Sequence, residues 1–151
     1  MDLRTPRTLR RPLLAILPIV VVAVAACGGS DDAEFIDGYN KAVAPLGTLM
    51  TDLGPTSATD PDAASKSLVK LADGLDQVRT ELAALEPPAD AADELDRLLT
   101  SLDKGTDQVR TMADAAKDGD LDKLTKATAK FSKTGTDLVT VEEELRAVVE
   151  G

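Results

Sequence analysis

The chain has 151 residues, of which 17 are basic and 27 acidic, so its formal net charge is −10. A surface of this sign repels nucleic acid and anionic lipid head groups, so we expect no nucleic-acid partner. The sequence has no histidine, no tryptophan and a single cysteine, which removes the usual general base and the normal ligands of zinc. We therefore expect no enzyme, no cofactor and no metal site.

The first 26 residues have the three parts of a secretory signal. Residues 1–12 carry four arginines against one acidic residue, and residues 13–26 contain no charge. Two small residues, Ala25 and Ala26, then precede the single cysteine, Cys27. A basic segment, a short apolar segment and small residues at the cut are typical of a cleaved export signal.

The end of this segment, Val24-Ala25-Ala26-Cys27, resembles the lipobox of bacterial lipoproteins, although Val24 stands where that family prefers leucine. The resemblance covers residues 1–27. It implies cleavage just before Cys27, lipidation of the Cys27 thiol, and a protein held by this lipid on the outer face of the cell membrane.

Two alternatives to lipidation of Cys27 remain. The apolar segment could be an uncleaved membrane anchor, but its fourteen residues are interrupted by Pro18, and a spanning helix needs about 20. The cysteine could also be a buried structural thiol, but the polar, glycine-rich residues 28–32 that follow it are typical of a solvated linker. We therefore expect residues 27–32 to form a flexible tether to a single domain over residues 33–151.

The first expected helix covers about residues 33–53. Its apolar residues recur on one side of a helix, as the period of 3.6 residues requires. They are Phe35, Ile36, Tyr39, Val43, Leu46, Met50 and Leu53. Because Pro45, Gly38 and Gly47 weaken the helix, we expect a kink or a break near Pro45.

The second helix has the clearest signals. Asp60 and Pro61 are an N-cap residue and a proline suited to the first helical position. Apolar residues then alternate at spacings of three and four until Pro87 and Pro88, which cannot donate helical hydrogen bonds. They are Leu68, Leu71, Leu75, Val78, Leu82 and Leu85.

Two further helices are predicted by the same alternation. The third has Leu95, Leu98, Leu102, Gly105, Val109, Met112 and Ala116 on one side. A turn over residues 117–120 follows, with Asp120 as the expected N-cap of the fourth helix. The fourth helix runs nearly to the end of the chain, with Leu121, Leu124, Ala127, Phe131, Thr134, Leu138, Val141, Leu145 and Val148 on one side.

Four amphipathic helices with short connections predict an all-α fold, an antiparallel up-down four-helix bundle. Alternating spacings of three and four favour nearly parallel packing of the helix axes, as in coiled coils. A long helical hairpin that dimerises is the rival fold. It is disfavoured because four apolar faces can surround one shared core within a single chain.

A five-residue repeat marks the middle of the second and third helices. Asp76–Thr80 recurs unchanged as Asp107–Thr111, and each copy follows two residues after a glycine, Gly74 or Gly105. Gly135 opens a degenerate third copy. Since a mid-helix glycine costs about 0.5–1 kcal/mol relative to alanine, a compensating role is expected. The three glycines could surround a small apolar cavity, or they could simply allow close packing or reflect a duplicated hairpin.

Four lysines line one flank of the fourth helix. Lys123, Lys126, Lys130 and Lys133 follow one another at spacings of three, four and three. They could bind an anionic partner, such as an envelope polymer or an acidic protein surface. Alternatively, they could pair with acidic residues of neighbouring helices, as charged residues do at the edges of coiled coils.

Three aspartates near the last turn have the spacing of a calcium loop. Asp118, Asp120 and Asp122 match its first, third and fifth positions, but Lys123 and Ala129 occupy the positions of the required glycine and glutamate. A helix cap explains these aspartates better, because acidic residues are favourable at a helix N-terminus.

Two functions remain open after these exclusions. The first is a membrane-anchored, non-enzymatic binding or scaffolding module of the cell envelope, which contacts another envelope protein or an anionic polymer. The alternative is a carrier or sensor of a small apolar ligand held in the core of the bundle near the three glycines.

Overall fold

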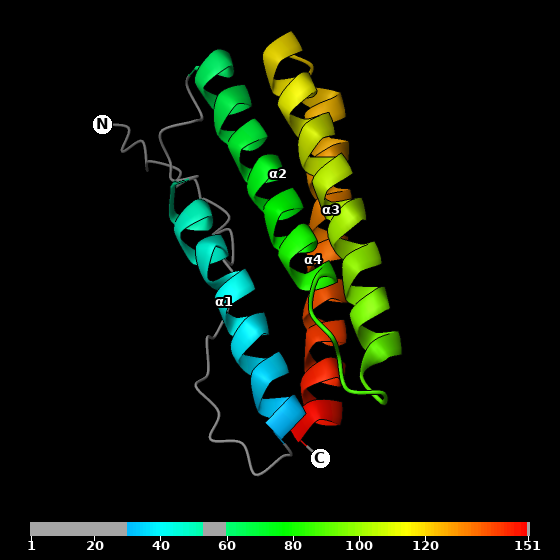
Figure 1. Cartoon of the computed structure of the whole chain (residues 1–151). Helices are drawn as coiled ribbons and strands as arrows, with labels where there is room; N and C mark the ends of the chain where they lie inside the picture. Colours follow the sequence, from blue (N-terminus) through cyan, green and yellow to red (C-terminus); the bar gives the residue numbers. More distant parts are fainter. Residues whose placement is uncertain (1–29, 53–59, 151) are drawn as a thin grey trace, which may run out of the picture.

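The computed structural model of this chain describes residues 30–52 and 60–150, which form four helices (Figure 1). They are α1 (Ser30–Asp52), α2 (Pro61–Ala83), α3 (Ala92–Asp118) and α4 (Leu121–Glu150). No strand occurs within these two ranges. The predicted all-α four-helix bundle is therefore confirmed, whereas the tether before residue 30 and the signal segment, with Cys27, lie outside the described residues.

The helices run alternately up and down, so that the start of α1, the α2–α3 connection and the end of α4 lie at one end of the bundle (Figure 1). The α3–α4 turn lies at the opposite end, where α3 and α4 rise beside the start of α2. The strongest helix contacts are those of α2 with α3 and of α3 with α4, and α1 packs mainly on α2. We call the two ends of the bundle the N-terminal end and the turn end.

Local capping fixes the boundaries of the helices. The Asp60 carboxylate accepts hydrogen bonds from the backbone N–H groups of Asp62 and Ala63, at 2.9 and 3.2 Å, as expected for the predicted N-cap. The Asp120 carboxylate accepts one from the N–H of Lys123 at 2.9 Å. Gly119 ends α3 with a φ of 69°, a left-handed conformation that favours glycine.

The core consists of the apolar faces predicted from the spacing. Within it, Val78, Leu82 and Val109 are at most 1% exposed. Leu121 differs from the prediction: it is the first residue of α4 and 73% exposed, so the apolar face begins with Leu124 and Ala127. Leu121 is exposed because the helices that would cover it end or turn at this end of the bundle.

Helix α1 departs from expectation at two places. It begins at Ser30, so Ser30, Asp31 and Asp32 are helical rather than part of a flexible tether. It also continues through Pro45, so the expected break does not occur. The Pro45 ring is exposed, and Ala42 and Val43 just before it are buried in the shared core. Packing of these neighbours compensates for the single hydrogen bond that proline cannot donate.

Candidate binding surface

The four lysines all lie exposed on α4, in its half nearest the turn end. None of them forms an ion pair with another residue in the part of the chain that the structure describes. We call Lys123, Lys126, Lys130 and Lys133 the lysine strip.

Three residues of the lysine strip line an open groove between α3 and α4, with a volume of about 500 Å³. Lys123, Lys126 and Lys130 form one wall, and α3 supplies the other. The remaining lining residues are Asp107, Gln108, Thr111, Asp120, Asp122 and Ala127. We call this hollow the turn-end groove. Lys133 is not among its lining residues.

The turn-end groove has mixed charge, because three aspartates accompany the lysines. The Asp120 carboxylate is already engaged as the cap of α4 through the N–H of Lys123. Asp122 lies in the first turn of α4, where the helix dipole stabilises a negative charge. Asp107 comes from α3, so the alternative in which acidic residues of a neighbouring helix lie beside the lysines is realised in part.

One polar atom at the turn-end groove has no partner. Gln108, a lining residue from α3, holds its side-chain carbonyl Oε1 buried without a hydrogen bond. A buried acceptor without a donor costs about 1–3 kcal/mol, so this atom is suited to receive a hydrogen bond from a ligand. Sequence reasoning missed Gln108, because its place in the groove depends on how α3 and α4 are aligned.

A second groove lies between α3 and α4 nearer the N-terminal end, with a volume of about 420 Å³. Arg97 and Lys104 of α3 face Asp137 of α4 there. Arg97 is already engaged, since its guanidinium donates to the Glu144 carboxylate at 2.5 Å. The turn-end groove therefore holds the lysines that remain unpaired.

The three mid-helix glycines do not form one cluster. A Cβ placed on Gly74 would lie 2.1 Å from Leu49 Cδ1 of α1. One on Gly105 would contact α4 at ordinary distances, 3.8 Å from Phe131, and one on Gly135 would meet nothing within 4 Å. The expected waist is therefore wrong: Gly74 accommodates α1, Gly105 lies against α4, and Gly135 faces open space.

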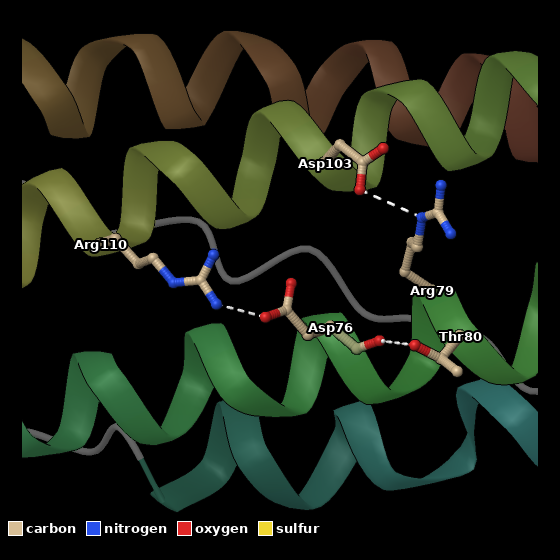
Figure 2. A network of polar contacts seen from close by, with 5 residues as sticks. All are labelled: Asp76, Arg79, Thr80, Asp103 and Arg110. Atoms are coloured by element: carbon tan, nitrogen blue, oxygen red, sulfur yellow. Dashed lines mark hydrogen bonds and ion pairs between the residues drawn. The ribbon is translucent and has the colours of Figure 1, made fainter.

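The repeated segments place an ion-pair network on the outer side of α2 and α3 (Figure 2). Arg110 of the second copy donates to Asp76 of the first. Arg79 of the first copy instead pairs with Asp103, at 3.1 Å, one turn before the second copy begins. The repeat thus has a structural role, and Asp107 is left beside the lysines.

Tyr39 carries the polar link between α1 and α4. Burial of its phenol raises its pKa well above the ordinary value of 10, the nearby Glu142 carboxylate raises it further and shares a hydrogen bond with it, and the Arg146 guanidinium opposes the shift. Arg146 also donates to the Glu142 carboxylate at 3.3 Å. This arrangement holds α1 in place and has the features of a structural contact.

No group of three potential metal-ligating side chains occurs among residues 30–52 and 60–150, so the three aspartates of the turn form no such group. Within the same residues, no helix is long and apolar enough to cross a membrane. Comparison with models of protein families, with curated proteins and with solved structures finds no match to this chain. The class that the structure itself defines is an acidic, antiparallel four-helix bundle with a lysine-lined groove at one end.

Proposed function

We propose that this protein is a bacterial lipoprotein, anchored through a lipid on Cys27 to the outer face of the cell membrane, and that it acts there as a non-enzymatic binding module. The lipobox-like segment Val24–Cys27 supports the anchor. The binding role is supported by one observation above all: the lysine strip lies on the half of the bundle far from the residue that follows the anchor.

The short connection between the anchor and the bundle sets its orientation in this proposal. Only three peptide steps separate Cys27 from Ser30, which begins α1. At 3.3–3.6 Å for each residue, they span at most about 10 Å. The N-terminal end of the bundle would therefore face the membrane. The turn end, with the turn-end groove, would face outward, where other envelope components can reach it.

The anchor is tested by metabolic labelling of cells with a fatty acid that is detected after gel electrophoresis. The wild-type protein should carry the label, and Cys27→Ala should carry none and be left unprocessed or released. Cys27→Ala leaves the described helices intact, so its helical circular dichroism spectrum serves as the folding control. An unlabelled wild-type protein would refute the anchor.

The outward binding surface is tested by reversing charge at each end of the bundle. Replacing the four residues of the lysine strip with glutamate should reduce cross-linking of the protein to envelope material in cells. A matched reversal of four exposed acidic residues around the α2–α3 connection should leave it unchanged. These are Glu81, Glu86, Asp90 and Asp93. Loss of cross-linking only with the second set would contradict the orientation.

A further inference from the structure

We propose that the turn-end groove binds a linear polyol phosphate polymer, a chain of phosphodiesters joined by hydroxyl-bearing units, laid lengthwise along α4. This inference rests on the proposed function, because such a polymer would be met outside the membrane. It goes further in naming the chemical class of the ligand and the residues that distinguish it.

The charge of the lysine strip provides the attraction. The strip concentrates four of the chain's lysines within eleven residues of a protein whose net charge is −10. No described residue forms an ion pair with any of them. Of the acidic residues that share the groove, Asp120 is engaged by the backbone of α4. Lysine binds phosphate as a point charge, without the planar geometry through which arginine recognises carboxylates.

The shape of the lysine strip fits a linear ligand. Neighbouring lysines at spacings of three and four lie on one flank of a helix, with Cβ atoms about 5–6 Å apart. From Lys123 to Lys133 the helix rises by about 15 Å, at 1.5 Å for each residue. A flexible chain with one negative charge in each repeat can therefore meet several lysines in succession.

Gln108 supplies the requirement for hydroxyl groups. Its buried Oε1 atom lacks a donor, and it lies in the same groove as the lysines. Phosphate oxygens cannot donate to it, whereas the hydroxyl of a polyol can. The unpartnered acceptor therefore favours a hydroxylated polyanion over a bare chain of phosphates.

The lining of the groove disfavours a protein or a membrane as the occupant. Ala127 is the single apolar side chain in it, and no aromatic residue or arginine is present. Protein interfaces depend on a few buried aromatic, apolar or arginine anchors, which this groove does not offer. An anionic membrane would be repelled by the acidic remainder of the bundle, whereas a thin polymer contacts the groove alone.

Binding is measured with the full chain in neutral detergent, by fluorescence anisotropy of labelled poly(glycerol phosphate). The variant Lys123→Gln, Lys126→Gln, Lys130→Gln should lower the affinity at least tenfold. The matched control is Lys41→Gln, Lys66→Gln, Lys70→Gln, which removes the same charge from exposed sites on α1 and α2. The control should stay within twofold of the wild type. Equal losses for both variants would show binding by net charge alone and overturn the proposal.

Gln108→Ala gives a second readout that net charge does not move. It should lower the affinity for poly(glycerol phosphate) about threefold or more, while the affinity for inorganic polyphosphate, which has no hydroxyl groups, should not change. An equal effect on both probes would refute the role of the hydroxyl. Retained helical circular dichroism in each variant establishes that the bundle is folded.

Three competitor probes test the choice of ligand: polyglutamate, a polyuronate and vesicles of anionic phospholipid. Each should bind more weakly than poly(glycerol phosphate). Tighter binding of polyglutamate would assign the groove to an acidic protein segment, tighter binding of the polyuronate to a carboxylate polymer, and tighter binding of vesicles to a membrane. Because these measurements use detergent, their failure leaves the lipid on Cys27 untouched, and failure of acyl labelling leaves the binding result standing.

Discussion

The contact of α1 with α2 and the contact of α2 with α3 join helices of similar length in different ways. Between α2 and α3, an alternating row of leucine and valine side chains is flanked by two ion pairs at the rim. Between α1 and α2, leucines pack directly over glycines: Leu85 lies over Gly38, and Leu49 over Gly74. The first contact has layers of side chains that can adjust, whereas the second depends on the absence of a Cβ.

The largest effect that separates the two contacts should come from Gly74→Ala. The new Cβ would lie 2.1 Å from Leu49 Cδ1, so Leu49 must move and α1 must shift on α2. The matched control is Gly135→Ala, because Gly135 is also inside a helix and nothing lies within 4 Å of its Cβ position. Helix propensity cancels in the difference between the two, so Gly74→Ala should be less stable by about 1–3 kcal/mol.

The free energies of unfolding follow from urea denaturation monitored by circular dichroism. Hydrogen exchange should show that the lost protection is greatest in α1. Gly135→Ala alone should raise the stability by about 0.5–1 kcal/mol, since alanine is the better helix former. Equal stability changes in the two variants would mean that Leu49 rearranges freely and that α1 does not depend on the glycine.

A smaller effect is expected from Tyr39→Phe, which removes the polar link between α1 and α4. Loss of the hydrogen bond with Glu142 should cost about 1 kcal/mol at neutral pH. The wild type carries a further dependence on pH, because the pKa of Tyr39 is higher in the folded than in the unfolded chain. The stability that the protonated phenol provides is therefore complete below the unfolded pKa of about 10 and is lost above it.

Urea denaturation between pH 7 and 11 measures this dependence. Lysines also titrate in this range in both proteins, so the informative quantity is the difference between wild type and Tyr39→Phe. That difference should shrink as the pH rises above about 10. A difference that stays constant over the whole range would contradict the raised pKa.

The smallest effect should come from the ion pairs of α2 and α3. The four side chains are 41–54% exposed, and exposed pairs contribute about 0.2–1 kcal/mol. A double-mutant cycle of Asp76→Asn and Arg110→Gln should give a coupling energy within that range, and 0.5 M salt should reduce it. A coupling above about 2 kcal/mol would place the stability of this contact in its charges rather than in its apolar row.

The apolar rows of all four helices could be predicted from the sequence because an alternation of three and four specifies which side of a helix is buried. Asp60 and Asp120 were predicted as caps for a similar reason, since capping involves residues only two or three positions apart. These features depend on neighbours in the chain. The structure therefore had little freedom to differ from the prediction.

The errors concern contacts between helices. Pro45 does not break α1, because packing against α2 stabilises the helix on both sides of the proline. Gly74 and Gly135 occupy similar places in the repeat, yet one lies under Leu49 and the other faces open space. The lysine strip was visible in the sequence, but Gln108 and Asp107 were not associated with it. Their proximity follows from the alignment of α3 with α4, which periodicity does not specify.

The up-down order of the helices brings the first residue of α1 and the last residues of α4 to the same end of the bundle (Figure 1). Adjacent ends are the condition under which a chain tolerates circular permutation. A short glycine-serine linker from residue 150 to residue 30 would make the four helices a closed ring, which can then be opened at another exposed connection. Opening it at Gly119, whose surroundings are free of contacts within 4 Å, would place both new ends beside the lysines. A reporter group could thus be attached directly at the surface whose ligand is in question.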